Sequence, residues 1–131
     1  MPPAAKAAPQ KALHILIVDD NMDQVHSLAF LLSHAGHAVD YAVNATVAMD
    51  LAERLQPDVI VLDVALPDGS GLSLAGELRR TPGLEKTYLI AITGTEVAAE
   101  EALAAGFDKF LRKPVSYSTL EEILAALLAG E

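Results

Sequence analysis

The sequence contains no cysteine, which excludes disulfide bonds, thiolate catalysis and zinc held by cysteine. It has no apolar run near the about 20 residues that a membrane-spanning helix requires. We therefore expect a soluble protein with no membrane partner, and a cytoplasmic location. Basic residues are also scarce, because 9 Lys and Arg stand against 18 Asp and Glu, a net charge of −9. Nucleic acid is not an expected partner, since its binding depends on basic residues that neutralise phosphates.

The 131 residues suit one compact domain, and a hydrophobic content of 52% is ample for its core. After Met1, residues 2–11 are Ala, Pro and Lys with a single Gln, and they lack the apolar block of a secretory signal. We predict a flexible leader over residues 1–11 and a folded domain over residues 12–131. The initiating Met1 and this leader favour a complete small protein.

Short apolar runs alternate with helical patterns from residue 13 onward. The runs predict buried strands over residues 13–18, 38–42, 58–62, 88–92 and 107–111. Between them, apolar residues at a spacing of three and four predict helices. Strict alternation with short connections predicts a doubly wound, flavodoxin-like α/β sandwich. Its five-stranded parallel sheet carries helices on both faces.

Several residues mark where the predicted helices begin and end. The first helix should stop at Gly36, and Asn44 should cap the second. Pro57 should close the second helix, whose inner face we predict as Val47, Ala48, Leu51, Ala52 and Leu55. Residues 67–71 should form a turn before the third helix, and an Ala-rich fourth helix should run to about Ala105. Ser118-Thr119-Leu120-Glu121 matches a capping box that would open the last helix.

Polar residues stand where the predicted strands end. They are Asp19 and Asp20 after the first strand, Asp63 after the third, Thr93 after the fourth and Lys113 after the fifth. Ligands of such sheets bind outside the carboxyl ends of the strands, so these side chains should meet on one rim. Three neighbouring acids repel one another unless a cation lies among them. An open, oxygen-only site with few carboxylates fits Mg²⁺ better than Ca²⁺.

These strand ends lie in motifs that resemble the receiver domain of bacterial two-component response regulators. The similarity covers residues 13 to about 129 and includes some receivers attached to hybrid histidine kinases. The motifs are Ile17-Val18-Asp19-Asp20-Asn21, Val61-Leu62-Asp63-Val64-Ala65-Leu66-Pro67-Asp68-Gly69, Ile92-Thr93-Gly94 and Phe110-Leu111-Arg112-Lys113-Pro114.

The resemblance implies a role for each matching position. Asp63 would be the phosphoacceptor, and it would bind Mg²⁺ together with Asp20 and the backbone carbonyl of Ala65. Asp19 would act on the metal through a bound water. Lys113 and Thr93 would contact the transferred phosphoryl group. Thr93 and Phe110 would form the switch that responds to it, and a cis bond often precedes the proline at position 114.

The resemblance also implies partners: a sensor histidine kinase as the donor, and a downstream protein or a histidine phosphotransfer protein. We expect a stand-alone response regulator that catalyses only its own phosphorylation and dephosphorylation and signals by protein contact. It would be a monomer or a weak homodimer through Ala- and Leu-rich helical surfaces. A receiver fragment or phosphorelay intermediate of a hybrid kinase is the alternative. The last helix lacks the basic residues with which DNA-binding relatives form their ion-paired dimer.

Two functions from other classes compete. A magnesium-dependent phosphohydrolase of the haloacid dehalogenase type also forms an aspartyl phosphate, but on its first strand and with a second acid two residues later. A flavin-binding carrier would need a hydroxyl-rich phosphate loop where Asp19, Asp20 and Asn21 stand. The four histidines form no metal-binding spacing, so we expect structural roles for His14, His26, His34 and His37.

Overall fold

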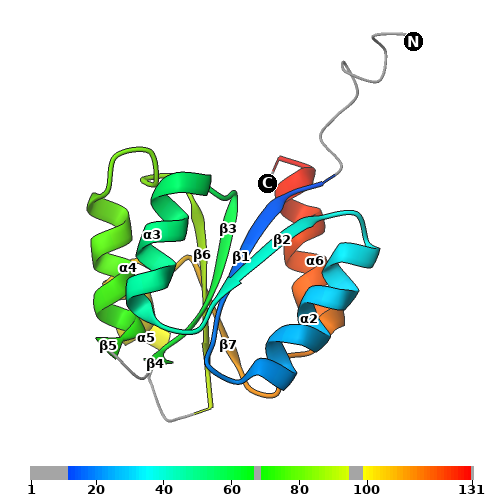
Figure 1. Ribbon diagram of the computed structural model, residues 1–131, viewed down its shortest axis with the longest axis horizontal. Coiled ribbons are helices and arrows are strands. Elements are labelled where there is room, and N and C mark those ends of the chain that lie inside the picture. The colour runs from blue at the N-terminus through cyan, green and yellow to red at the C-terminus, as the bar shows by residue number, and fades with distance from the viewer. Residues whose placement is uncertain (1–11, 67–68, 95–98, 131) are drawn as a thin grey trace, which may run out of the picture.

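The computed structural model describes residues 12–66, 69–94 and 99–130. Its main sheet has five parallel strands in the order β2–β1–β3–β6–β7 (Figure 1). The strands are β1 (His14–Val18), β2 (Ala38–Ala42), β3 (Val59–Asp63), β6 (Tyr88–Thr93) and β7 (Lys109–Arg112). The chain adds β2 on one side of β1 and the later strands on the other, which is the flavodoxin-like order. The predicted fold class is confirmed.

Helices cover both faces of the sheet. Figure 1 shows α2 (Met22–His34) and α6 (Tyr117–Leu128) on one face, and α3 (Ala45–Leu55), α4 (Gly71–Arg80) and α5 (Ala99–Ala105) on the other. Between β3 and α4 lies a small antiparallel pair, β4 (Ala65–Leu66) with β5 (Gly69–Ser70). None of the described helices combines the length and apolar character needed to cross a bilayer.

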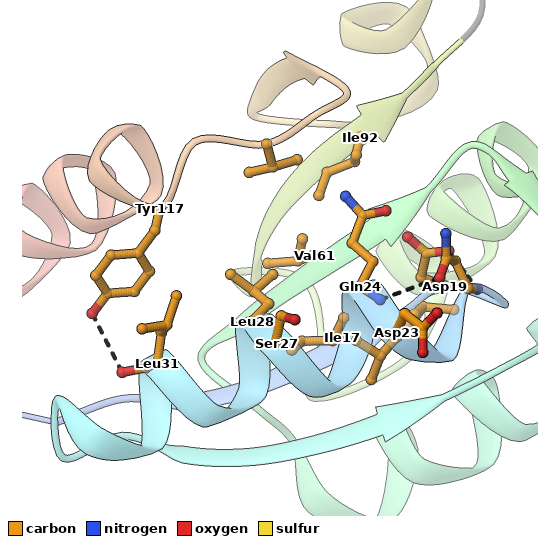
Figure 2. A pocket seen from close by; sticks show the side chains of 14 residues that line it. Ile17, Asp19, Asp23, Gln24, Ser27, Leu28, Leu31, Val61, Ile92 and Tyr117 are labelled. Carbon is orange, nitrogen blue, oxygen red and sulfur yellow. Dashed lines mark hydrogen bonds between the residues drawn. The ribbon is translucent and has the colours of Figure 1, made fainter.

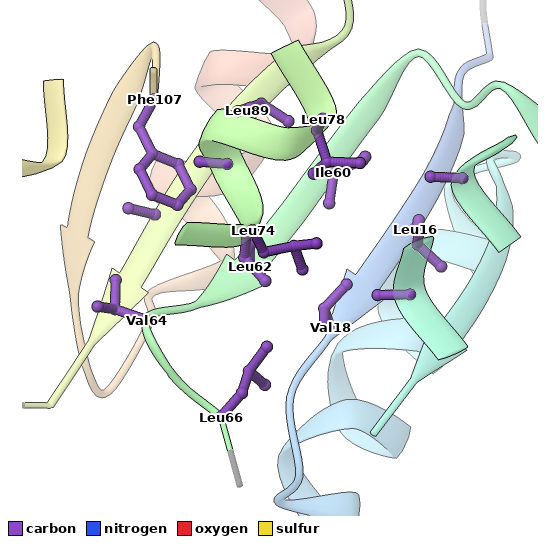
Figure 3. Packing of buried hydrophobic residues seen from close by; sticks show 14 of the residues in the cluster. Leu16, Val18, Ile60, Leu62, Val64, Leu66, Leu74, Leu78, Leu89 and Phe107 are labelled. Atoms are coloured by element: carbon purple, nitrogen blue, oxygen red, sulfur yellow. The ribbon is translucent and has the colours of Figure 1, made fainter. Parts of the chain in front are cut away.

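Each face of the sheet has its own hydrophobic core. Leu16 and Val18 of β1 point to the α3–α4 side, where they join Leu62, Leu74 and other residues (Figure 3). Ile15 and Ile17 of the same strand pack with α2 and α6 on the other side. All five residues of β3 are buried. A strand buried on both faces needs apolar side chains at consecutive positions, which is why the sequence shows unbroken apolar runs.

Three helix ends lie where the sequence predicts them. Asn44 caps α3 by accepting a hydrogen bond from the Val47 amide at 2.8 Å, as predicted. Gly36 follows α2 with φ of +99°, a conformation that glycine adopts without strain. Gln56 ends α3 in a left-handed conformation immediately before Pro57. The leader, Pro67 and Asp68 of the predicted turn, and residues 95–98 before α5 lie outside the described residues.

The predicted capping box of the last helix is wrong. The N-cap is Ser116, whose hydroxyl accepts from the Thr119 amide at 3.4 Å, and α6 begins at Tyr117 instead of after Ser118. A contact between helices accounts for the earlier start. The Tyr117 hydroxyl donates to the Leu31 carbonyl of α2 at 3.4 Å, so the first turn of α6 is anchored where Tyr117 meets α2.

Three other sequence-based details also need correction. Val47 is 42% exposed and lies outside the inner face of α3, where the buried positions are the smaller Ala48 and Ala52. Gly69 and Ser70 are not simply a turn, because they form β5. The last strand begins at Lys109, since the Phe107 amide bonds to the Ala102 carbonyl of α5 instead of to the sheet.

Candidate functional site

The carboxyl ends of β1, β3, β6 and β7 form one rim, and the predicted polar residues lie along it. Asp19 follows β1, Asp63 ends β3, Thr93 ends β6, and Lys113 follows β7. Asp20 is exposed at the same edge. Residues that are up to 94 positions apart in the sequence therefore meet because their strands are parallel neighbours.

Lys113 joins two buried carboxylates. Its Nζ lies 3.1 Å from Oδ2 of Asp19 and 3.1 Å from Oδ2 of Asp63. Asp19 and Asp63 are only 4% and 5% exposed, so each carboxylate has lost most of its hydration. An ammonium at this distance compensates part of that loss. A backbone hydrogen bond holds Lys113 in place, since its amide donates to the Thr93 carbonyl at 2.8 Å.

Backbone amides hold the second oxygen of each buried carboxylate. Oδ1 of Asp19 accepts from the Asn21 amide at 3.0 Å, and Oδ1 of Asp63 accepts from the Ala65 amide at 3.0 Å. In both cases the donor is two residues further along the chain, which is the geometry of an Asx turn. These bonds fix the orientation of each carboxyl group before any ligand binds.

Burial raises the pKa of Asp63 above its usual value, and the negative charge of Asp19 adds to the effect. The Ala65 amide and Lys113 act in the opposite direction without cancelling it. Burial lowers the pKa of Lys113, but its hydrogen bonds and charge interactions with Asp19 and Asp63 outweigh burial and raise it. Lys113 is therefore charged at neutral pH. Additional positive charge near Asp63 would stabilise the ionised form of its carboxyl group.

The three acids fit a divalent cation. One carboxylate oxygen from each of Asp19, Asp20 and Asp63 lies within 4.8 Å of the others. With Lys113 as the cation beside them, the four side chains carry a net charge of −2 when all are ionised, which a divalent ion would balance. The donors are hard oxygens, and exposed Asp20 leaves an open side where an ion keeps bound waters. This donor set suits Mg²⁺.

A groove of about 440 Å³ adjoins this rim (Figure 2). It runs between α2 and the start of α6, from Asp19 at one end to Tyr117 at the other, over apolar residues of the sheet. The charged residues among those that line it are Asp19 and Asp23, both acids. Such a groove repels a phosphate, which argues against the flavin-carrier alternative.

Comparison with known proteins identifies the family. The family model of the response regulator receiver domain matches residues 15–125. The chain belongs to this family.

The chain is similar to a small protein, to part of a longer response regulator and to a solved receiver structure. It is 40% identical to an uncharacterized 14.6 kDa protein of Leptolyngbya boryana, over 79% of this chain and 80% of that protein. It is 35% identical to the response regulator MprA of Mycobacterium sp. (strain KMS), over 89% of this chain and 50% of MprA. A CheY-like receiver structure from Methylobacillus flagellatus superposes with a TM-score of 0.79 at 32% identity, covering 86% of this chain and 96% of that one.

A receiver within a larger protein is also similar. The chain is 32% identical to the sensor protein ArcB of Escherichia coli, over 88% of this chain but only 15% of ArcB. The chain thus spans about half of MprA and a small part of ArcB. Similarity to both response regulators and hybrid kinases is consistent with the resemblance read from the motifs.

Thr93 and Phe110 lie on neighbouring strands of the receiver domain. Thr93 is fully buried, and it follows Ile92, which pairs with Asp63 across the β3–β6 boundary. Phe110 lies opposite Ala91 on β7 and is partly buried against the core. Its ring is 5.9 Å from the guanidinium carbon of Arg112. The Lys113–Pro114 bond is cis, as the resemblance implied.

Arg79 fixes the start of the strand that carries Phe110, a link that sequence reasoning missed. Its Nε donates to the Gly106 carbonyl at 2.9 Å, and its Nη2 donates to Oδ2 of Asp108 at 2.6 Å. The same Asp108 oxygen accepts from the Leu89 amide at 2.9 Å. These bonds tie α4 and β6 to the turn before β7. In the sequence Arg79 showed only as half of a basic pair, and nothing pointed to Asp108 as its partner.

Gly71 is a second residue that sequence reasoning missed. A Cβ atom placed there would lie 2.5 Å from the Asp63 carbonyl oxygen and 2.7 Å from the Val64 Cα, both backbone atoms. Its amide also donates to the Val64 carbonyl at 2.7 Å. Only a residue without a side chain fits so close to the end of β3. The available signal was a glycine eight positions after Asp63, at a place where the sequence predicts a turn.

Gly71→Ala is therefore expected to destabilise the receiver domain by about 1–3 kcal/mol, because the backbone around Asp63 must move to admit a methyl group. The matched control is Gly76→Ala in the same helix. There the nearest atom to a new Cβ is the flexible Arg80 Nη1 at 3.4 Å. Gly76→Ala should be neutral or more stable by about 0.5–1 kcal/mol. Urea unfolding of both variants measures the difference, and equal midpoints would contradict the steric argument.

Proposed function

We propose that this receiver domain is the phosphorylation-activated part of a two-component system, in which Asp63 accepts a phosphoryl group from a sensor histidine kinase. The observation that carries the proposal is the contact of Lys113 with two buried carboxylates, Asp19 and Asp63, at 3.1 Å each. Burying two carboxylates costs free energy, and a structural ion pair with Lys113 would need only one carboxylate. The arrangement suits a site that binds further cations and anions in turn.

The chemistry follows from the position of Asp63. A carboxylate oxygen attacks the phosphorus of a phosphohistidine on the kinase, and a new P–O bond forms as the P–N bond breaks. The electron pair of that bond stays on the imidazole nitrogen, which takes a proton from solvent. The Lys113 ammonium and the Thr93 hydroxyl bind the phosphoryl oxygens and stabilise their charge.

Asp19, Asp20, Asp63 and the backbone carbonyl of Ala65 would hold Mg²⁺, with Asp19 acting through water. The ion, when bound, supplies positive charge beside the phosphoryl oxygens. The Ala65 amide already bonds to Asp63, so the backbone at this position lies against the carboxylate. Exposed Asp20 is the side chain that most easily adjusts to an ion.

The domain modifies only itself in this proposal, so it acts as a substrate and switch. Its output would pass by contact to a downstream protein or a histidine phosphotransfer protein, in the cytoplasm. Similarity to the receiver of ArcB keeps the alternative of a hybrid-kinase receiver or phosphorelay intermediate. A small phosphohydrolase is the remaining alternative from another class, and brisk multiple turnover of a generic phosphate ester would favour it.

The proposal predicts that a small acyl phosphate phosphorylates the protein only when Mg²⁺ is present. Intact-mass spectrometry should show the addition of one phosphoryl group. Removing Mg²⁺ with a chelator should slow the reaction by more than about 100-fold, because the metal contributes several kcal/mol of charge stabilisation. Ca²⁺ at the same concentration is the matched control and should be much less effective. Equal labelling with and without metal would refute the role of the acidic cluster.

A further inference from the structure

The side chain of Arg79, at the end of α4, binds acceptors in two other segments of the receiver domain. Its Nη1 donates to the carbonyls of Glu85 at 3.0 Å and Thr87 at 2.6 Å, just before β6. Its Nε and Nη2 donate to Gly106 and Asp108, just before β7. The planar guanidinium group can serve several acceptors at once in a fixed geometry, which a lysine cannot do. Arg79 therefore holds the starts of two neighbouring strands against the end of α4.

Hydrophobic burial positions β7 only weakly. Within the described part of the chain, β7 is an edge strand and β6 is its one partner. None of its four residues is fully buried, whereas all five residues of β3 are. Phe110 packs against the core on the α3–α4 side of the sheet, and Leu111 packs against the core on the α2–α6 side. The strand is thus anchored by one partly buried side chain on each face.

The sequence of β7 does not by itself select one register on β6. It reads Lys109-Phe110-Leu111-Arg112, with a basic residue at each end and two apolar residues between. A slip of one residue moves every side chain to the opposite face of the sheet. Here the slip would exchange Phe110 and Leu111 between two faces that are both apolar. Contacts outside the strand must therefore favour the observed register, in which Phe110 pairs with Ala91.

Asp108 supplies such contacts at the start of β7. Its amide donates to the Leu89 carbonyl at 2.7 Å, and its Oδ2 accepts from the Leu89 amide at 2.9 Å. The same Oδ2 accepts from Arg79 at 2.6 Å, which holds the carboxylate in place. Gly106 also lies close to Arg79, since a Cβ atom placed there would be 3.1 Å from the Arg79 Cγ. These contacts fix which residue of β6 lies beside Asp108.

The register of β7 sets the reach of Lys113, because Lys113 directly follows the strand. One residue along a strand corresponds to about 3.3 Å, which is as large as the 3.1 Å contacts of Lys113 with Asp19 and Asp63. We propose that Arg79 is a positioning residue for the phosphorylation of Asp63, a role that rests on the proposed function. Through Asp108, Arg79 fixes the register of β7 and so places Lys113 between the two carboxylates, from the opposite end of the sheet.

Arg79→Met tests this role, because methionine keeps much of the apolar stem but donates no hydrogen bond. At saturating Mg²⁺ and acyl phosphate, the maximal rate of labelling at Asp63 should fall at least about tenfold, since a misplaced charge stabilises the phosphoryl oxygens less. The Mg²⁺ concentration that gives half of this rate should stay within about twofold of wild type. The proposed metal ligands lie at the ends of β1 and β3, which Arg79 does not hold.

Arg80→Met is the matched control, since Arg80 is the next residue of α4 and is exposed. It should be labelled at the wild-type rate. Arg79→Lys keeps the charge but loses the fixed fork of donors, so its rate should lie between those of wild type and Arg79→Met. The lysine variant also decides the question if Arg79→Met does not fold. A wild-type rate in every folded Arg79 variant, or an equal loss in Arg80→Met, would overturn the role.

Nuclear Overhauser contacts between β6 and β7 report the register directly and separate positioning from a general loss of stability. In wild type, Phe110 should contact Ala91, its partner in the sheet. In Arg79→Met this contact should weaken, and contacts from Phe110 to Ile90 or Ile92 should appear. A slower rate with unchanged contacts would mean that Arg79 does not act through the register of β7. A wild type that is never labelled would refute the proposed function instead, and the contacts would still decide whether Arg79 sets the register.

Discussion

Replacing Asp63 with asparagine is expected to abolish phosphorylation by a small acyl phosphate, to below the detection limit of intact-mass spectrometry. An amide has nearly the shape of the carboxylate but cannot form an acyl phosphate. Its oxygen can still accept from the Ala65 amide, which bonds to Oδ1 of Asp63 at 3.0 Å. The local backbone should therefore keep its conformation, and the loss would report chemistry instead of misfolding.

The control for this experiment is Asp23→Asn. Asp23 lies on α2 and lines the groove that begins at Asp19, but it is outside the acidic cluster. This variant should be labelled like wild type. Asp63→Asn should also unfold at an equal or higher temperature without Mg²⁺, because burial raises the pKa of Asp63 and so disfavours its ionised form in the fold. Labelling that persists in Asp63→Asn would mean that another residue is the phosphoacceptor.

Thr93→Ala is expected to separate phosphorylation from its consequences. Thr93 is fully buried at the end of β6, next to β7. In the proposed switch its hydroxyl would follow the phosphoryl group, and the shift would pass to β7. The variant should still be labelled at Asp63. Its response to a phosphoryl mimic such as beryllofluoride, measured as amide shift changes at Phe110 and Leu111, should fall at least several-fold.

Thr93→Ser is the matched control, because it keeps the hydroxyl and removes only a methyl group. It should respond to beryllofluoride nearly as wild type does. Loss of the response in both variants would indicate that the response depends on the packing around Thr93 and not on a hydrogen bond of its hydroxyl. A full response in Thr93→Ala would show that the switch does not pass through this residue.

The order of strands and helices could be predicted because it depends on local patterns. A strand buried on both faces has a run of consecutive apolar residues, as β3 has over Val59–Leu62, and that run is visible without any knowledge of the fold. Asn44 likewise caps α3 through an amide only three residues away. Parallel connection then places all strand ends on one rim, so the candidate site residues followed from where the apolar runs stop.

Details that depend on contacts between distant elements were predicted wrongly. The capping-box pattern predicts Ser118 as the cap of the last helix, whereas the structure has Ser116, and the bond from Tyr117 to Leu31 of α2 favours the earlier start. Val47 matches the apolar pattern of α3 but stays exposed, since the buried positions of this helix are filled by small alanines. These choices are made by packing across the fold, which a local pattern does not contain.

The sequence by itself determined which residues gather on the rim, because strand polarity and the receiver motifs specify them. Only the tertiary structure decided how they meet. It placed Lys113 at equal distance from two carboxylates, placed Gly71 against the backbone of Asp63, and left Phe30 of α2 exposed. The physical reason is that distance, burial and exposure depend on how the helices pack on the sheet, whereas residue identity and period are properties of the chain alone.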